Sequence, residues 1–142
     1  GIVVFLFVKD IFNGGNQIIF FLLVLLGSIL PDIDEKHSKI NRWSGFFGLI
    51  IAFFFKHRGL FHSIVLHGLL FLILSVAFQK YYAFALLSGY LAHIIGDGVT
   101  LAGVPIFYPF SNFKIKGPVK VGGWMEGVLF LLLVGLVVSR FV

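Results

Sequence analysis

Residues 60–78 read LFHSIVLHGLLFLILSVAF, an apolar stretch whose only polar side chains are two histidines and two serines. Its length matches the ~20 residues that an α-helix needs to cross the hydrocarbon core of a bilayer. Residues 124–142, WMEGVLFLLLVGLVVSRFV, meet the same criterion. Residues 17–30 and 81–95 are also apolar, but they are shorter and each ends in a polar cluster. This pattern predicts an all-α, multi-pass helical membrane protein.

The composition supports a membrane protein and excludes several other classes. Of the 142 residues, 59% are hydrophobic and 12% are charged, and Phe occurs 19 times, whereas a soluble domain is about 45–50% apolar and about 25% charged. Cys is absent, which excludes disulfides, thiol nucleophiles and Cys-ligated zinc. The net charge of +5 fits basic residues at the edge of an anionic membrane rather than a nucleic-acid partner. Residues 1–142 are therefore expected to form a single integral membrane domain.

Shorter segments complete the predicted architecture of about four to five hydrophobic helices. Residues 1–8 are apolar and fit the end of a further helix. Residues 44–55 are too short for a full span, which favours a re-entrant or interfacial segment. Residues 99–123 contain three of the four prolines and a run of glycines, and we expect a loop or hairpin that lies on the membrane surface.

Ionisable residues are concentrated at a few places that this topology brings to one membrane face. An antiparallel pair of helices over 60–78 and 81–95 places His57 and His62 at the same end as His93 and Asp97. Glu126 joins them if the loop over 99–123 does not cross the bilayer. Asp32 and Asp34 join only if residues 44–55 do not span, which is why we interpret that segment as re-entrant.

The distribution of basic residues predicts which side this face is on. Short loops rich in Lys and Arg stay in the cytoplasm, and the face that holds the ionisable cluster has more of them. It therefore faces the cytoplasm in this prediction. That side holds Lys36, Lys39, Arg42, Lys56, Arg58, Lys114, Lys116 and Lys120, against Lys9, Lys80 and Arg140 on the other.

The residue types in the cluster favour a metal site. Neutral imidazole and carboxylate groups suit zinc, manganese or iron. His93 and Asp97 stand four residues apart, so both project from one face of a helix and can chelate one ion; ordinary polar contacts at a helix end are the alternative. Asp32 and Asp34 follow Pro31, which ends the preceding helix. An extended segment would direct at least one of the two carboxylates into the cluster, and a simple helix-terminating loop is the alternative.

The segment around residue 60 is the densest part of the cluster. His57 and His62 can bind one ion only if the segment between them is not a regular helix, because residues five apart on a helix diverge by about 140°. Arg58 can bind phosphate oxygens in a fork, or it pairs with Asp34 or with a lipid headgroup. Ser63 is expected to cap the following helix.

Three further ionisable residues have more than one interpretation. Glu126 can be a metal ligand, a general base or a favourable charge at a helix N-terminus. His67 is expected to be buried and hydrogen-bonded rather than a ligand, and His37 to be solvated.

Taken together, the motifs resemble the YdjM-like family of membrane-bound metal-dependent hydrolases, some bacterial members of which are LexA-regulated. The resemblance covers most of the chain in order. It rests on Leu30-Pro31-Asp32-Ile33-Asp34, on His57-Arg58-Gly59-Leu60-Phe61-His62-Ser63, on Gly89-Tyr90-Leu91-Ala92-His93-Ile94-Ile95-Gly96-Asp97, and on Thr100 to Pro105 and Tyr108-Pro109-Phe110.

The family is grouped with the phospholipase C/P1 nuclease superfamily, whose helical enzymes hold zinc ions with His and Asp. One family feature is missing: a His shortly before the first hydrophobic segment is either absent here or lies upstream of Gly1, so we expect a metal site that is incomplete by that ligand. The resemblance implies that the ligands are Asp32, His57, His62, His93 and Asp97, with Asp34 and Glu126 as ligands or base.

The leading prediction is an enzyme: a membrane-embedded hydrolase that uses a divalent metal, Zn or else Mn or Fe, to cleave a phosphoester of a lipid or lipid-linked substrate. Asp34 or Glu126 takes the proton and Arg58 holds the phosphate. Its partners are membrane lipids, and no oligomeric state is predicted. The alternatives are transport of protons or metal ions through the cluster and a non-catalytic membrane adaptor with a structural metal.

Overall fold

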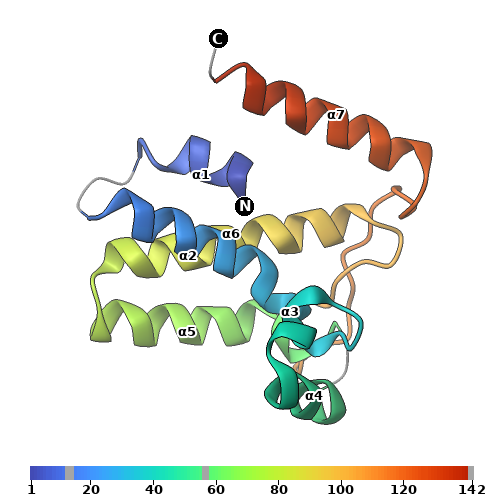
Figure 1. Cartoon of the computed structure of the whole chain (residues 1–142). Coiled ribbons are helices and arrows are strands. Elements are labelled where there is room, and N and C mark those ends of the chain that lie inside the picture. The colour runs from blue at the N-terminus through green and yellow to red at the C-terminus, as the bar shows by residue number, and fades with distance from the viewer. Residues whose placement is uncertain (12–14, 56–57, 141–142) are drawn as a thin grey trace.

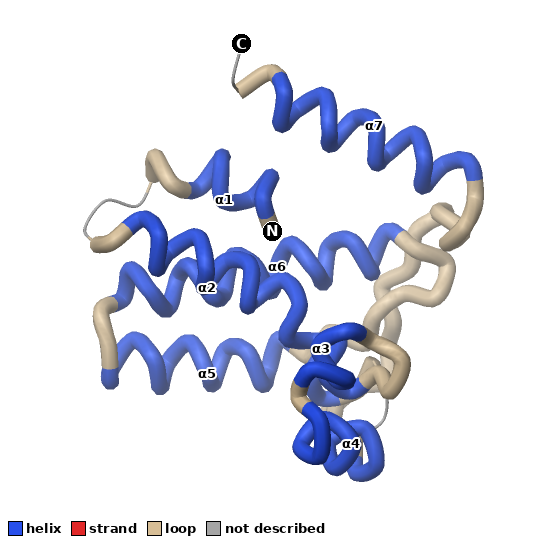
Figure 2. Tube along the Cα trace, viewed as in Figure 1, coloured by secondary structure: helices blue, strands red, loops and turns tan. Residues whose placement is uncertain are grey.

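The computed structural model describes residues 1–11, 15–55 and 58–140, and in this part of the chain all regular secondary structure is helical (Figures 1 and 2). The predicted all-α class is confirmed. The elements in chain order are α1 (Ile2–Val8), α2 (Gln17–Ile29), the 3-10 helix η1 (Leu30–Asp34), α3 (Lys39–Trp43), α4 (Gly45–Phe54), the 3-10 helix η2 (Leu60–His62), α5 (Ile64–Ala77), α6 (Lys80–Val99) and α7 (Trp124–Val138).

Helix α6 is the centre of the molecule, with α2 and α5 packed against it (Figure 1). Helices α5 and α6 form the antiparallel pair that the sequence predicts. The α2–α6 contact is very close, because a Cβ atom at Gly27 would clash with the carbonyl oxygen of Leu86, and one at Gly89 with that of Val24. Small residues allow such close approach between helices in membranes, where packing rather than hydrophobic burial holds helices together.

The buried core lies along α6 in two groups. Near the start of α6, Phe20 and Val24 of α2 pack against Tyr81 and Ala85, and the rings of Phe20 and Tyr81 are 4.6 Å apart. Near its end, Tyr90 and Ile94 pack against Val104 of the following loop. The second group lies directly beside the polar cluster described below, so that cluster has a rigid support.

Much of the remaining apolar surface has no protein covering. No residue of α7 is buried, and the helix stands apart from the bundle, near α1 (Figure 1). In α4, only Gly48 is buried. Among the described residues, the combined helix Gln17–Asp34 is the one that is long and apolar enough to cross a membrane by length and composition.

Three predicted segment bounds differ from the structure. The apolar stretch over 60–78 is not one helix: η2 ends at His62, and α5 begins at Ile64 because the Ser63 hydroxyl caps it by accepting the Val65 N–H at 3.1 Å. Helix α6 extends beyond residues 81–95 at both ends. The α-helix before Pro31 ends as predicted, but Asp32 and Asp34 lie in a 3-10 helix rather than an extended segment.

The segment over 99–123 is irregular, with isolated bridges between Thr100 and Val119 and between Val104 and Ile115. The loop also packs against the rest of the molecule, and its position on the membrane surface stays a prediction. Its backbone packs against the start of α5, since the Ile64 N–H donates to the Ile106 carbonyl oxygen at 2.9 Å. Val104 and Val119 are buried. These contacts fix the loop at the end of the molecule where α2 ends, α5 begins and α6 ends.

Candidate metal centre

Helix α6 contributes His93 and Asp97, one turn apart on the same face. The His93 Nδ1–H donates to the backbone carbonyl oxygen of Ser28 at 2.8 Å. Because a carbonyl oxygen can only accept, this bond places the hydrogen on Nδ1 and leaves the Nε2 lone pair for a ligand. His93 Nε2 is buried and has no hydrogen-bond partner among the described residues. It lies 3.9 Å from Asp97 Oδ2.

The 3-10 helix η1 contributes two carboxylates that face different histidines. Asp32 Oδ1 lies 3.7 Å from His93 Nε2, and Asp34 Oδ2 lies 3.5 Å from His62 Nδ1. The Asp34 side chain is fully buried, whereas that of Asp32 is 43% exposed. The tight 3-10 turn thus directs both carboxylates into the cluster, and solvent reaches only one of them.

His62 is the residue that connects the two carboxylate groups. Its side chain is fully buried, with Nδ1 toward Asp34 and Nε2 3.5 Å from Asp97 Oδ2. The break in the helix at Ser63 makes this orientation possible, because it turns the 3-10 segment before α5 toward α6. The residues directly before α5 form a 3-10 turn rather than part of the regular helix, and joint binding of one ion by His57 and His62 stays a prediction.

These groups have the spacing of a ligand set. One ligand atom each from Asp32, His62 and His93 lies within 4.8 Å of the others, and Asp97 Oδ2 is 3.5 and 3.9 Å from the two Nε2 atoms. Zinc ligands ~2.0–2.2 Å from the ion lie roughly 3.3–3.6 Å apart in a tetrahedron. Asp32, His62 and His93 can therefore supply three ligands to one ion, and Asp97 lies close enough to both imidazoles to be a candidate for the fourth. Asp34 lies behind His62, in the place of an outer partner that orients a ligating imidazole.

Arg58 borders the cluster. Its Nη2 lies 3.2 Å from Asp97 Oδ2, and its Nη1 donates to the Gly103 carbonyl oxygen at 3.1 Å. The backbone of Arg58 has φ 57°, a left-handed conformation that non-glycine residues rarely adopt. The guanidinium is therefore held beside the carboxylate by two independent contacts.

Two candidate residues are not part of this cluster. Glu126 is exposed and accepts a hydrogen bond from the Gly122 N–H, which closes the turn before α7. It lines a cavity with Ile95 of α6, and Ile95 is about 200° around the helix from His93. The structure thus places Glu126 on another side of α6, where it serves the helix N-terminus. His57 lies outside the described residues.

The other two histidines lie as expected. His67 is buried, its Nδ1–H donates to the Ser63 carbonyl oxygen at 3.3 Å, and its ring stacks on Tyr90 at 3.3 Å. His37 is exposed.

Sequence reasoning missed two supporting residues. Ser28 acts through its backbone carbonyl, which no side-chain pattern reveals. Asn41 is buried, and its amide nitrogen donates to the carbonyl oxygens of Ile33 and Gly48 at 2.6 Å each. It ties η1 to α4. Lys39, Arg42 and Ser44 beside it in the sequence are polar as well, so no local pattern singled out Asn41.

The profile of the YdjM inner membrane protein family matches residues 1–141. The chain belongs to this family. It is 33% identical over 106 residues to the inner membrane protein YdjM of Escherichia coli, covering 68% of this chain and 52% of that protein, and equally similar to YdjM of Shigella flexneri. It is 29% identical over 117 residues to the uncharacterized protein YvsG of Bacillus subtilis, covering 80% of this chain and 71% of that one.

The chain thus spans about half the length of the two YdjM relatives. No solved structure shows significant similarity to it. Membership of the YdjM family confirms the membrane location that the composition predicts.

Proposed function

We propose that this protein is a multi-pass membrane-embedded hydrolase that uses a divalent metal to cleave a phosphoester of a lipid or lipid-linked substrate. The observation that carries the proposal is the convergence of Asp32, His62, His93 and Asp97 from three separate parts of the chain. Buried ionisable groups in a membrane protein are costly, and they mark functional sites. Zinc suits this donor set best, and manganese or iron are alternatives.

An ion bound by these residues would supply Lewis acidity and a lower pKa for a coordinated water. Asp34 Oδ2 lies 3.5 Å from His62 Nδ1, a position from which a carboxylate can orient the imidazole so that Nε2 faces the ion. The Arg58 Nη2 atom lies beside Asp97 Oδ2 at the edge of the metal centre, where it can bind a phosphoryl oxygen. Asp32 would bind the ion through one carboxylate oxygen, and the other oxygen of this exposed side chain would accept a proton, because Asp34 is buried and Glu126 lies outside the cluster.

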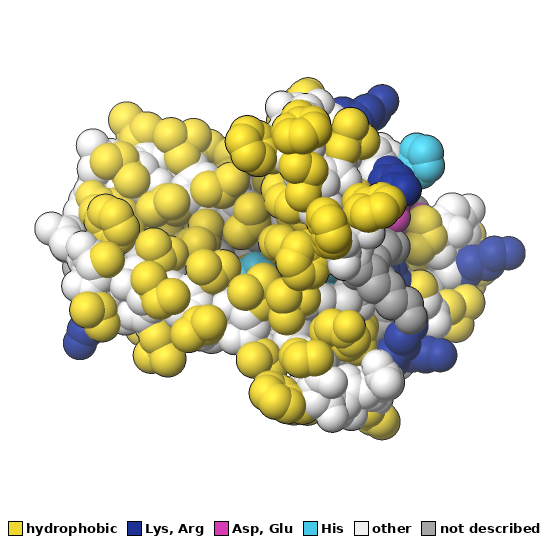
Figure 3. Space-filling model, turned by 90° about the horizontal axis from the view of Figure 1, so that it is seen from below, with side chains coloured by type: hydrophobic (Ala, Val, Ile, Leu, Met, Phe, Trp, Pro, Cys, Tyr) yellow, Lys and Arg dark blue, Asp and Glu magenta, His cyan; other side chains and the backbone are white. Residues whose placement is uncertain are grey.

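The surface charge supports a site that faces the cytoplasm. In Figure 3, most of the visible Lys and Arg side chains gather at one end of the molecule, and the rest of that face is largely hydrophobic. The basic loop residues Lys36 and Lys116 are exposed and come from the two segments adjoining the metal centre. Basic segments of this kind remain on the cytoplasmic side.

The first test is metal content, measured by elemental analysis of detergent-purified protein. We expect about one equivalent of zinc, manganese or iron per chain. His62→Ala and His93→Ala should each lose it, whereas His37→Ala, a change at an exposed histidine, should retain it. Wild-type protein that binds no metal after reconstitution would overturn the proposal.

The second test is catalysis. Metal-loaded protein is screened against phospholipids and lipid-linked phosphates, with release of phosphate or of the headgroup as the readout. Hydrolysis that a chelator abolishes and the metal restores supports the enzyme. A protein that binds metal with all positions closed and cleaves no lipid phosphoester would instead be an adaptor with a structural metal.

A further inference from the structure

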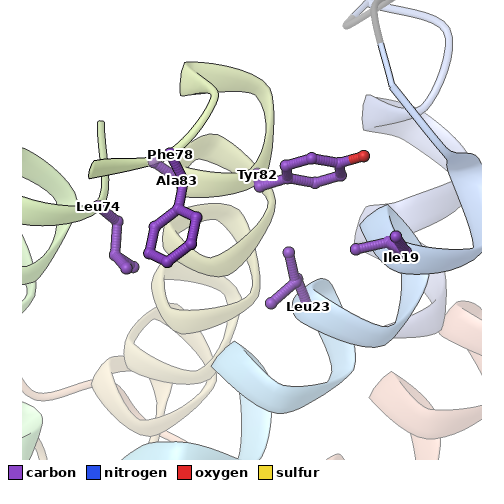
Figure 4. A pocket seen from close by; sticks show the side chains of 6 residues that line it. All are labelled: Ile19, Leu23, Leu74, Phe78, Tyr82 and Ala83. Atoms are coloured by element: carbon purple, nitrogen blue, oxygen red, sulfur yellow. The ribbon is translucent and has the colours of Figure 1, made fainter. Parts of the chain in front are cut away.

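A cavity of about 410 Å³ lies between α2, α5 and α6, toward the end of the bundle opposite the metal centre (Figure 4). Its lining carries one hydroxyl, that of Tyr82, whose oxygen accepts the Asn16 N–H at 3.2 Å, and the other lining side chains are apolar. The cavity, called the chain pocket below, is lined by Ile19, Leu23, Leu74, Phe78, Tyr82 and Ala83.

The chain pocket and the metal centre share one helix. Ala83 of the pocket and His93 of the centre are ten residues apart on α6 (93 − 83 = 10), which is ~15 Å along the helix axis. Between α5 and α6, Ala83 and His67 line a gap that is too narrow for a water molecule, and the His67 ring stacks on Tyr90 in the core beside the metal centre. On the hydrophobic face seen in Figure 3, a histidine side chain is visible between apolar ones near the middle.

The dimensions of the pocket indicate its occupant. The hydrocarbon core of a bilayer is ~30 Å thick, so ~15 Å is the depth of one leaflet and the reach of one lipid chain. The pocket volume lies in the range of ~300–1,000 Å³ that small-molecule sites occupy. A helix of a second copy does not fit, because 15 Å of a helix ~10 Å across fills roughly 1,200 Å³.

We propose that the chain pocket binds the end of one acyl chain of the phospholipid whose head lies at the metal centre. This proposal rests on the proposed function for the position of the head, and on the pocket itself for the chain. The length of the acyl chain then sets the position of the head: when the end of the acyl chain fills the pocket, the phosphoester lies at the level of His93. Lipids with shorter chains are held less often in this position.

The test uses a phosphatidylglycerol that carries a photoreactive diazirine at the end of one acyl chain. This lipid is mixed into phosphatidylcholine vesicles that contain the protein of residues 1–142. Labelling is done with a chelator present, so neither metal nor turnover is needed. Labelled positions are mapped by mass spectrometry. We expect labels concentrated at Ile19, Leu23, Leu74 and Phe78.

The matched variants are Leu23→Trp, which fills the pocket, and Leu22→Trp, which adds the same indole at an exposed neighbour outside it. Leu23→Trp should reduce labelling at Phe78 several-fold, and Leu22→Trp should leave it unchanged. If the wild-type protein is labelled as strongly at the exposed Leu72 as at Phe78, only annular lipid covers the pocket and the proposal is overturned. Labelling by a diazirine fatty acid that equals that by the phospholipid also overturns it.

A parallel hydrolysis assay separates the two proposals. Specific labelling without hydrolysis of any phosphoester retains the chain pocket and refutes the hydrolase. Hydrolysis at the same rate for short-chain and long-chain phosphoesters, together with uniform labelling, retains the hydrolase and refutes the pocket. A hydrolase that uses the pocket should prefer long-chain substrates, and Leu23→Trp should remove that preference without loss of bound metal.

Discussion

Replacing Asp34 by Asn tests whether this carboxylate orients His62. The change keeps the shape of the side chain and removes its charge. Asp34 is fully buried and 3.5 Å from His62 Nδ1, so it is not screened by water. Outer partners of metal-bound histidines are worth about 10–100-fold in metal affinity, or ~1.4–2.7 kcal/mol at tenfold per ~1.4 kcal/mol. We expect Asp34→Asn to weaken zinc binding by that factor without abolishing it.

The assay is competition for zinc between the detergent-purified protein and a chromophoric chelator. Asp10→Asn, the same change at an exposed aspartate at the other end of the molecule, should bind zinc like the wild type. Thermal unfolding of the metal-free variants checks that the fold is intact. If Asp34→Asn binds zinc within twofold of the wild type while His62→Ala loses it, Asp34 does not orient the imidazole. A complete loss would instead make Asp34 a direct ligand.

Three other predictions concern packing, support and substrate binding. Gly89→Val should push α2 away from α6, because its Cβ would clash with the Val24 carbonyl oxygen. We expect thermal unfolding to show a loss of about 1–3 kcal/mol in stability. Gly135→Val, whose Cβ would meet open space, should show no comparable loss. Asn41→Leu should remove the amide donor from the Ile33 and Gly48 carbonyl oxygens; we expect a loss of about 1–3 kcal/mol in stability, and an unchanged melting temperature would contradict this. Arg58→Gln should raise KM for a phosphoester more than it lowers metal content, and equal losses of both would refute a role in substrate binding.

Which helix ends meet at the metal centre could be predicted from the sequence. The antiparallel pair over 60–78 and 81–95 is enough to bring His62 to His93 and Asp97, because a tight turn leaves no other arrangement. The grouping of Asp32 with them required only that α4 be too short to span. These arguments use chain length and connectivity, which the sequence states directly.

The internal geometry of the site could not be predicted in the same way. Asn41 anchors the 3-10 helix η1 through the Ile33 carbonyl oxygen. The backbone bond from Ile64 to Ile106, forty-two residues later, holds the turn that follows His62. Local patterns carry no information on such distant partners. Glu126 was misplaced for the same reason: its position follows from the path of the long loop, which composition alone does not determine.

The order of the ligands along the chain has a consequence for biogenesis. Asp32 and Asp34 leave the ribosome before His62, and His93 and Asp97 follow roughly 60 residues after Asp32, which takes roughly 3–12 s at ~5–20 residues per second. During that interval Asp32 has no His93 to face, and for about the first half of it Asp34 has no His62. Because Asp32 and Asp34 directly follow the first long apolar helix, they can remain hydrated at the aqueous edge of the bilayer until the histidines arrive. Metal loading is therefore expected to be a late step, after α6 has been inserted.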